Sequence, residues 1–245
     1  MIPYFELHNF TIGPITIQFW GLMVALGFLI GGFVSAWRAK QKGFSVDLVW
    51  DVLFWIFIFA FIFARLFHVF LYDFNHYLQA PLDALNPFLP GFSIIGGVIG
   101  SVLAFYIFTK KRKIDFWKFG DVAIFGFPLG LGIGRIGCFL IHDHPGLATN
   151  FVLGVKYPDG IIRHDHGFYL SLLGWLTFFV FLFFRKRVLK DGFFIGLWLF
   201  IYTVIRFVLD FYRLYDQRYL FLTPTQWVLI PTFVLAIWIL FLKKK

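Results

Sequence analysis

Residues 48–72 read LVWDVLFWIFIFAFIFARLFHVFLY, a long apolar run that contains two formally charged residues, Asp51 and Arg65. About 20 apolar residues in a helix span the roughly 30 Å of hydrocarbon in a bilayer. A helix is the expected form, because it satisfies every backbone hydrogen bond within its own segment. The stretch therefore predicts a transmembrane span with an arginine inside it.

The rest of the chain has the same character. Of its 245 residues, 60% are hydrophobic and 14% are charged, and the mean hydropathy is +0.81. This is more apolar surface than a soluble core can take up. Seven runs are long enough to cross a membrane, at residues 15–37, 48–72, 91–108, 121–141, 168–184, 193–212 and 224–242. We predict an all-α, polytopic membrane protein with seven transmembrane helices, forming a single integral membrane domain over residues 1–245.

Basic residues predict the orientation of these spans. Fifteen of the 22 Lys and Arg follow the first, third, fifth and seventh runs, against four in the loops on the other side. Loops rich in Lys and Arg stay in the cytoplasm. We therefore expect the N-terminus outside and the C-terminus in the cytoplasm. The N-terminus lacks the features of a removable signal peptide, so we expect the first span to be retained.

The same basic loops explain the net charge of +9 without a nucleic-acid partner. Cys138 is the one cysteine of the chain, which excludes an intrachain disulfide and a metal cluster made of cysteines. Neither charge nor cysteine content therefore points to a function, and the intramembrane charges become the informative feature.

Arg65, Arg135 and Arg206 each lie inside an apolar run, about seven residues from its predicted outer end. At 1.5 Å per residue this is about 10 Å below the outer boundary. A charge at that depth is costly unless it is paired or solvated, so three arginines at one level indicate a site for an anionic lipid. Asp210 lies four residues after Arg206, on the same helical face and within ion-pair reach. We predict that these groups converge in the outer leaflet.

Arg135 has the most demanding context of the three arginines. It lies in GLGIGRIG at residues 130–137, where glycines let another backbone or a ligand approach closely. Packing of small residues between helices would not by itself require the charge. The stretch therefore favours a functional role for Arg135. Arg65 and Arg206 have structural alternatives, namely snorkelling toward water or pairing with a neighbouring acid.

Six motifs together resemble those of the bacterial prolipoprotein diacylglyceryl transferase family. The chain is similar to that family in FWGLM (19–23), ARLFHV (64–69), FSIIGGVIG (92–100), GRIGCFLIHDHPG (134–146), RHDHGFYLSLLG (163–174) and YTVIRFVLDFYR (202–213). The order of the motifs and the predicted seven spans with an external N-terminus also agree with the family.

The resemblance implies transfer of the diacylglyceryl group from phosphatidylglycerol to the lipobox cysteine thiol in the signal peptide of a prolipoprotein. It implies no cofactor and no bound metal, surrounding membrane lipids as partners, and a location in the bacterial cytoplasmic membrane. Arg135 and Arg206 would hold the headgroup and the leaving phosphate, Asp210 would orient Arg206, and Asp143 would align Arg135 or the headgroup. The residues implied to bind substrate are Arg65, Gly96, Gly97, Gly146, Trp20, Cys138, His164 and Tyr169.

The chain departs from the family pattern at several positions. The third-span motif of the family usually has a His directly before the paired glycines, and this chain has Ile95 there. The family often has Asn at the position of Cys138 and Tyr at the position of Trp20. We therefore expect a divergent member whose base for the incoming thiol comes from elsewhere.

Two HDH triplets, at residues 142–144 and 164–166, offer replacement bases, since a His of near-neutral pKa can take the thiol proton. His142 is our candidate for a catalytic role, with His144 and His166 as alternatives. The same triplets could instead bind zinc or another divalent ion, because they place four His and two Asp on neighbouring external loops.

Two further alternatives stay open. A non-catalytic phospholipid-binding or transport protein of the same fold could keep the arginine pocket after losing the base at Ile95. Cys138 could also be the nucleophile of a different acyl transferase, because Arg135 lies one turn away and could lower its pKa.

Overall fold

The computed structural model describes residues 1–86, 89–214 and 217–243. Within them, seven helical segments are long and apolar enough to cross a membrane, which confirms the predicted number of spans. Their bounds are Phe19–Gln41, Val46–Leu71, Ile94–Arg112, Phe116–Ile141, His166–Phe184, Phe193–Asp210 and Pro224–Leu242. The protein is thus a mostly helical, multi-pass membrane protein.

The chain divides into two compact units. The larger unit comprises Met1–Arg38 and Gly120–Lys245, and the smaller unit comprises Ala39–Phe119. The predicted catalytic residues all belong to the larger unit, whereas Arg65 and the glycine pair after Ile95 belong to the smaller one. The single membrane domain over residues 1–245 stays a prediction.

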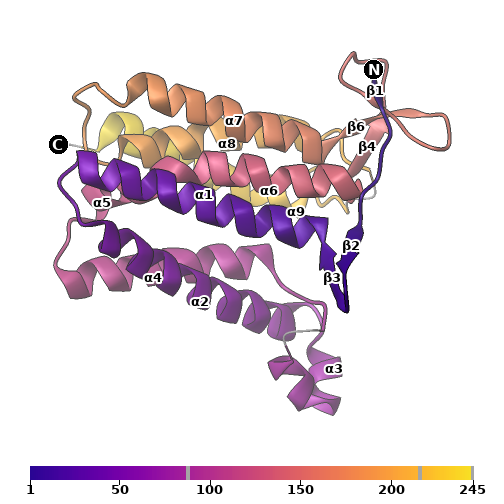
Figure 1. Cartoon of the computed structure of the whole chain (residues 1–245), viewed down its shortest axis with the longest axis horizontal. Helices are drawn as coiled ribbons and strands as arrows, with labels where there is room; N and C mark the ends of the chain where they lie inside the picture. The colour runs from indigo at the N-terminus through magenta and orange to yellow at the C-terminus, as the bar shows by residue number, and fades with distance from the viewer. Residues whose placement is uncertain (87–88, 215–216, 244–245) are drawn as a thin grey trace. The chain divides into compact units, whose positions relative to one another are not determined.

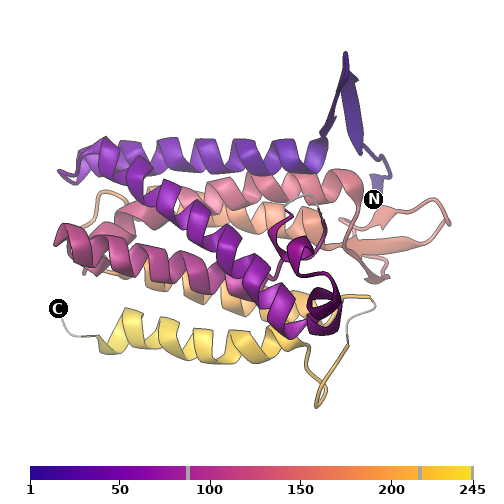
Figure 2. The ribbon, with the colours of Figure 1, turned by 90° about the horizontal axis from the view of Figure 1, so that it is seen from below.

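The larger unit is a bundle of long helices (Figure 1). Its helices are α1 (Phe19–Gln41, whose last turn joins the smaller unit), α6 (Phe127–Ile141), α7 (His166–Phe184), α8 (Phe193–Asp210) and α9 (Pro224–Ile237), which continues as the π-helical turn η3 (Trp238–Leu242). Figure 2 shows α1 and α9 on opposite sides of this unit. The fourth span is interrupted, because the 3-10 turn η2 (Ile124–Gly126) separates α5 (Phe116–Ala123) from α6.

The glycines around Arg135 are explained by helix packing on two sides of α6. A Cβ on Gly130 would lie 2.6 Å from the carbonyl oxygen of Gly27 in α1, and a Cβ on Gly174 in α7 would lie 2.6 Å from the backbone nitrogen of Gly132. The Ser171 hydroxyl donates to the carbonyl oxygen of Gly132 at 2.8 Å. Small residues therefore let three helix backbones meet, so of the two expected neighbours of these glycines, a backbone or a ligand, the structure shows backbones.

Short strands, which the sequence analysis did not predict, lie at the end of the larger unit where α1 begins (Figure 1). One sheet has the order β1-β5-β6-β4, with β1 (Ile2–Pro3) parallel to β5 (Val155–Lys156) and antiparallel pairing of β6 (Ile162–Asp165) with both β5 and β4 (Pro145–Ala148). A separate hairpin pairs β2 (Asn9–Ile12) with β3 (Ile15–Gln18), directly before α1. The first span was therefore predicted four residues too early, because residues 15–18 form β3.

The opposite end of the larger unit carries η3 and a buried aromatic cluster of Phe125, Phe181, Phe194 and Trp198. Beside it, the Asp121 carboxylate accepts backbone N–H bonds from Gly192 at 2.8 Å and from Ile195 at 3.1 Å. These bonds satisfy orphan donors in the first turn of α8. Asp121 thus stabilises the start of α8, at the end of the larger unit remote from the sheet.

The smaller unit is built on the pairing of α2 (Val46–Leu71) with α4 (Ile94–Arg112), together with α3 (Phe74–Gln79) and the 3-10 helix η1 (Pro81–Leu85). The two long helices meet at glycines of α4. A Cβ on Gly96 would lie 2.6 Å from Cβ of Phe67, and a Cβ on Gly100 would lie 2.8 Å from Cβ of Phe63. Close contact between α2 and α4 therefore requires glycine at both positions of α4.

Candidate active site

The end of α6 is fixed by His142, which adopts a left-handed backbone conformation with φ of 47°. Such a conformation is uncommon for a residue other than glycine. Its ring is held on both sides: Nδ1 lies 2.7 Å from Oδ2 of Asp165, and Nε2 lies 3.0 Å from the carbonyl oxygen of Phe5. Tyr4 stacks on the ring at a centroid distance of 4.4 Å. His142 thereby sets the direction in which the chain leaves the span.

Asp165 links this turn to the next span. Its Oδ1 accepts the backbone N–H of Phe168 at 3.0 Å and so caps α7, while its Oδ2 accepts the hydroxyl of Tyr157 at 3.0 Å. Burial, followed by the charge of Asp165, raises the pKa of Tyr157, so the phenol remains a donor. The backbone N–H of His166 also donates to the carbonyl oxygen of His144 at 3.2 Å. The end of α6 and the start of α7 are therefore joined by several bonds.

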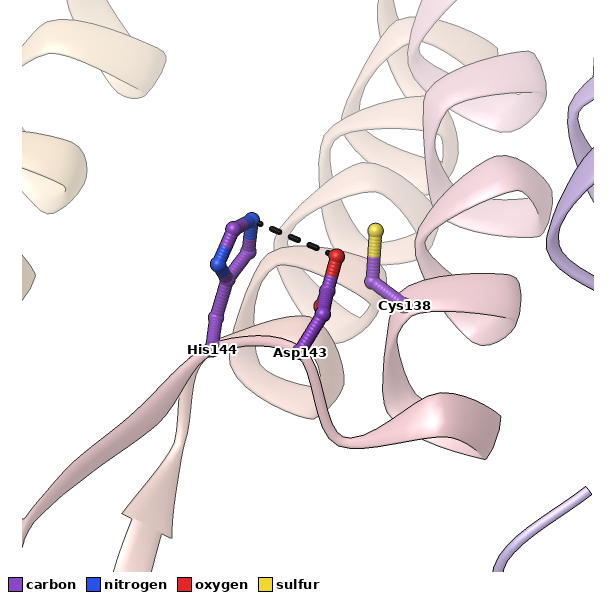
Figure 3. A group of neighbouring side chains, drawn as sticks. All are labelled: Cys138, Asp143 and His144. Carbon is purple, nitrogen blue, oxygen red and sulfur yellow. Dashed lines mark ion pairs between the residues drawn. The ribbon is translucent and has the colours of Figure 1, made fainter. Parts of the chain in front are cut away.

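Cys138, Asp143 and His144 form a compact group beside this junction (Figure 3). One ligand-type atom from each of them lies within 4.8 Å of the others, and Nε2 of His144 lies 3.6 Å from Oδ2 of Asp143. Cys138 is buried, whereas the side chains of His144 and Asp143 are 36% and 29% exposed. Arg135 donates from Nη1 to Sγ of Cys138 at 3.7 Å, and the side chain of Trp20 hydrogen-bonds to the same thiol.

Arg206 lies on α8 and is held by a buried acid. Its Nη2 lies 2.9 Å from Oδ1 of Asp210, whose side chain is fully buried. The other oxygen of Asp210 accepts the hydroxyl of Thr223 at 2.6 Å. Thr223 is the N-cap of α9 and forms a capping box with Gln226. Asp210 therefore fixes Arg206 and at the same time joins the end of α8 to the start of α9.

The charges of three arginines act on His144. Burial lowers the pKa of His144, Asp143 opposes that shift, and the charges of Arg135, Arg213 and Arg206 add to it. Arg213 also lies 3.9 Å from Oδ1 of Asp210. Arg206 and Arg213 thus share Asp210, and Arg135 contacts Cys138, at the end of the larger unit that carries the sheet. Convergence of the arginines on one site stays a prediction.

Gly146 positions the segment that carries His144. It pairs with Arg213 in an antiparallel β-bridge, and the neighbouring Leu147 donates its N–H to the carbonyl oxygen of Tyr212 at 2.8 Å. A Cβ on Gly146 would lie 2.7 Å from that same oxygen and 2.8 Å from Cβ of His164. Only glycine allows this approach, so the end of α8 and the β4 segment lie side by side.

The second HDH triplet does not join the first in one cluster. Nδ1 of His164 lies 2.9 Å from the hydroxyl of Tyr169, and burial lowers the pKa of His164. Nε2 of His166 lies 2.9 Å from the carbonyl oxygen of Leu209, while its buried Nδ1 has no hydrogen-bond partner among the described residues. Across the described part of the chain, the group with metal-ligand spacing is the Cys138 group. The alternative metal site made of four His and two Asp is therefore not formed among the described residues.

Comparisons with known proteins identify the family of the chain. The family profile described as prolipoprotein diacylglyceryl transferase matches residues 8–242. The chain belongs to the prolipoprotein diacylglyceryl transferase family. It is 35% identical over 221 residues to the phosphatidylglycerol–prolipoprotein diacylglyceryl transferase of Pasteurella multocida (strain Pm70), which covers 88% of this chain and 82% of the relative.

Relatives of the same name occur in other bacteria. The one from Aliarcobacter butzleri (strain RM4018) is 30% identical over 231 residues, covering 89% of this chain and 85% of the relative. The one from Staphylococcus saprophyticus is 31% identical over 220 residues, covering 85% and 78%. The predicted family is therefore confirmed, and the match extends over nearly the whole of this family member.

In this member of the diacylglyceryl transferase family, Arg65 organises a loop of the smaller unit. Its side chain lies between the rings of Tyr77 and Phe92, at 5.3 Å and 5.4 Å from their centroids. All three guanidinium nitrogens donate to backbone carbonyl oxygens, at distances of 2.6 Å to 3.4 Å. The acceptors belong to Asp83, Ala84, Asn86, Leu89, Pro90 and Gly91. A guanidinium has five N–H donors, and these bonds use them all. Substrate binding by Arg65 stays a prediction, and its observed contacts are structural.

The other predicted residues of the smaller unit lie at the start of α4. Gly96 is buried against α2, and a Cβ on Gly97 would lie 3.7 Å from Cβ of Ala64. Ile95, at the position of the missing family His, is 41% exposed. Helix packing accounts for Gly96, whereas Gly97 has room for a Cβ at ordinary contact distance. The role of both glycines in substrate binding stays a prediction.

Arg213 and Asp165 are the residues of this site that the sequence analysis did not select. We counted Arg213 as a charge of an external loop, although its position three residues after Asp210 places it within reach of that acid. Asp165 belonged to a triplet in which only the histidines were considered as bases. Its cap of α7 is a local bond to Phe168, whereas its bond to His142 depends on a tertiary contact that spacing alone does not reveal.

Proposed function

We propose that this protein transfers the diacylglyceryl group of phosphatidylglycerol to the cysteine thiol of prolipoprotein signal peptides. Membership of the family over residues 8–242 and the names of its relatives support both substrates. The observation that carries the assignment of a site is the Cys138, Asp143 and His144 group, whose ligand-type atoms lie within 4.8 Å of one another and whose thiol is 3.7 Å from Arg135. Arg206 and Arg213 both face Asp210 at the same end of the larger unit. The site thus combines cations with a partly exposed imidazole able to take a proton.

The reaction joins the cysteine sulfur to the terminal glycerol carbon of the diacylglyceryl group. The bond between that carbon and the phosphoester oxygen breaks, and glycerol phosphate leaves with the bonding electrons. The thiol proton passes to a base of the protein. Negative charge therefore builds up on the departing phosphate oxygen, so donors fixed around that oxygen lower the barrier.

Arg135 and Arg206 are suited to hold the phosphate. Arginine binds phosphate oxygens through paired, charge-assisted hydrogen bonds. Asp210 holds Arg206 by one side, and the guanidinium of Arg135 makes a long contact of 3.7 Å to the thiol of Cys138. A phosphate would exchange that weak thiol contact of Arg135 for a much stronger one. Arg213 adds a third positive charge to the same pocket.

His144 is the base that the contacts favour, with Asp143 beside it. Its imidazole is 36% exposed, and its Nε2 faces a carboxylate at 3.6 Å rather than a backbone carbonyl. Burial lowers its pKa, so the neutral form that accepts a proton persists below the usual range of His. His166 is 1% exposed and has Nε2 bonded to Leu209, which leaves it poorly placed to meet an incoming thiol.

His142 fits a positioning role better than the catalytic role predicted for it. Both of its ring nitrogens face acceptor oxygens, from Asp165 and Phe5, and its side chain is 2% exposed. It would act by fixing the turn that presents Asp143 and His144. In the same way, Gly146, His164 and Tyr169 would shape the pocket rather than touch the reacting atoms.

We place the reaction at the outer leaflet of the bacterial cytoplasmic membrane. The alternation of basic loops favours an external N-terminus, and the arginine pocket lies at the same end of the larger unit as β1. Prolipoproteins reach that side after their signal peptide enters the membrane. Reporter fusions to the loops after α6 and α7 test this orientation, and a cytoplasmic 142–167 loop would contradict it.

Complementation of a bacterium depleted of its own transferase tests the proposed activity. The native chain should restore growth and lipid attachment to a prolipoprotein, and the Arg135→Ala variant should restore neither. Both chains must reach the membrane in equal amounts, as judged by immunoblotting.

The same experiment weighs the non-catalytic alternative. A native chain that inserts and binds phosphatidylglycerol yet does not restore lipid attachment would overturn the transferase proposal and favour lipid binding or transport. Transfer from labelled phosphatidylglycerol to a lipobox peptide by the purified protein gives an independent answer.

A further inference from the structure

We propose that Cys138, Asp143 and His144 bind a zinc ion, and that this ion inhibits the proposed transferase. The metal-binding part of the proposal stands on the geometry of the three side chains alone. The inhibitory part rests on the proposed function, because it assumes that the same pocket carries out the transfer.

The donor set is the kind that zinc prefers, since a thiolate, an imidazole and a carboxylate are all zinc ligands. With zinc–ligand bonds of about 2.0–2.3 Å, ligand atoms around a tetrahedral ion lie roughly 3.3–3.7 Å apart. The His144–Asp143 distance of 3.6 Å already falls in this range, and all three ligand atoms lie within 4.8 Å of one another. Small rotations of the partly exposed His144 and Asp143 would complete the approach to Cys138.

The nearby arginines do not exclude zinc from this site, and the thiolate makes the site selective for zinc. Zinc binding releases the thiol proton of Cys138 to solvent, and the ion with one thiolate and one carboxylate then forms a neutral group. Arg135, 3.7 Å from the sulfur, offsets part of the cost of burying the thiolate. An ion held by carboxylates and water alone, such as Mg²⁺, gains nothing from the sulfur and should bind far more weakly.

Three protein ligands leave the fourth zinc position for water or an anion, as in sites that stay open to small molecules. A phosphate oxygen could take that position, because the nearby guanidinium groups attract anions. Inhibition would follow from the loss of His144 and Asp143 to the metal. His144 could no longer accept a proton while its lone pair is bound to zinc.

Cobalt(II) in place of zinc tests the site in the full-length protein purified in detergent. Bound cobalt should reach one ion per chain and produce a thiolate-to-cobalt absorption band in the near ultraviolet, which zinc should abolish by displacement. Cys138→Ser should lose the band, and His144→Ala should weaken cobalt affinity about 10-fold or more. His76→Ala is the matched control, because His76 pairs with Asp83 at 3.2 Å in an exposed pair and should leave the band unchanged.

X-ray absorption on the zinc-loaded native chain gives an answer that needs no variant. A sulfur scatterer at about 2.3 Å is expected, and Cys138 is the one cysteine able to supply it. Absence of that sulfur, or a cobalt band that survives in Cys138→Ser, would overturn the proposal.

Transfer activity separates the two proposals. Micromolar zinc should inhibit the native chain, and removal of zinc by a chelator should restore activity. A sulfur-bound metal in a protein without transfer activity would support the metal site and contradict the proposed function. An active enzyme that binds no metal would support the proposed function and contradict the metal site.

Discussion

Arg65 in the smaller unit and Arg206 in the larger unit look alike in the sequence but have different surroundings. Arg65 donates to six backbone carbonyls and lies between two aromatic rings. Arg206 is held on one side by the carboxylate of Asp210, which Arg213 also approaches, at 3.9 Å. All the N–H donors of Arg65 are bonded within the fold, whereas Arg206 is held in place near other positive charges.

The difference teaches that burial of a charge in an apolar span does not by itself indicate a ligand site. Neutral carbonyls satisfy the hydrogen bonds of Arg65 and leave one isolated cation in a stable loop. Arginines that face one another repel, and such an arrangement persists where an anion is to be bound. The number of like charges in a pocket is thus more informative than the depth of any one of them.

The largest effect is expected from Arg135→Lys. Lysine keeps the charge but loses the paired hydrogen bonds, so the rate of transfer should fall about 10²–10³-fold with little change in stability. Single-turnover transfer from labelled phosphatidylglycerol measures it. A variant with more than a third of native activity would place Arg135 outside the reacting centre.

His144→Ala and His142→Ala sharpen the contrast between a base and a positioning residue. His144→Ala should lower the transfer rate per folded molecule by about 10²-fold. His142→Ala should mainly lower the melting temperature, because it leaves the buried Asp165 without its partner at 2.7 Å. The opposite pattern, with a stable but inactive His142 variant, would restore His142 as the base.

Asp210→Asn tests how Arg206 is held. Breaking a buried ion pair costs about 3–5 kcal/mol, because one charge is left uncompensated. Thr223→Val removes one hydrogen bond to the same carboxylate and an N-cap, so it should cost about 1 kcal/mol. Thermal unfolding in detergent compares the two, and equal losses would show that Asp210 does not hold Arg206.

Arg112→Ala should have the smallest effect. Arg112 pairs with Asp51 at 3.0 Å, but both side chains are about half exposed. Exposed pairs contribute about 0–1 kcal/mol, so stability and transfer should both stay near native values. A large loss of activity here would mean that the variants above report general damage to the bundle rather than the pocket.

The sequence was sufficient for the spans and for much of the pocket, because both depend on local signals. Apolar runs identify transmembrane helices directly, and the i, i+4 spacing of Arg206 and Asp210 predicts their ion pair. The β2–β3 hairpin was missed because β3 is apolar and continuous with α1, so it was counted as part of the first span. Its Gly13-Pro14 turn was the available signal.

Features that depend on distant partners could not be predicted. Arg65 finds its carbonyl acceptors 18 to 26 residues away, in a loop whose path no motif specifies. The glycines around Arg135 pack against α1 and α7, and sequence alone does not say which helices become neighbours. The two HDH triplets look equivalent in the sequence, yet Asp165 of the second caps α7 and holds His142 of the first, whereas His144 of the first is partly exposed.

Phosphatidylglycerol affinity of matched arginine variants tests the central claim most directly. Binding of the lipid to purified protein in nanodiscs of phosphatidylcholine should weaken at least about 10-fold in Arg135→Gln and Arg206→Gln, since each loses a charge-assisted pair worth roughly 1.5–3 kcal/mol. In Arg65→Gln, the folded fraction should bind the lipid as the native chain does. Equal weakening in all three variants, or weakening confined to Arg65→Gln, would contradict a phosphate site in the larger unit.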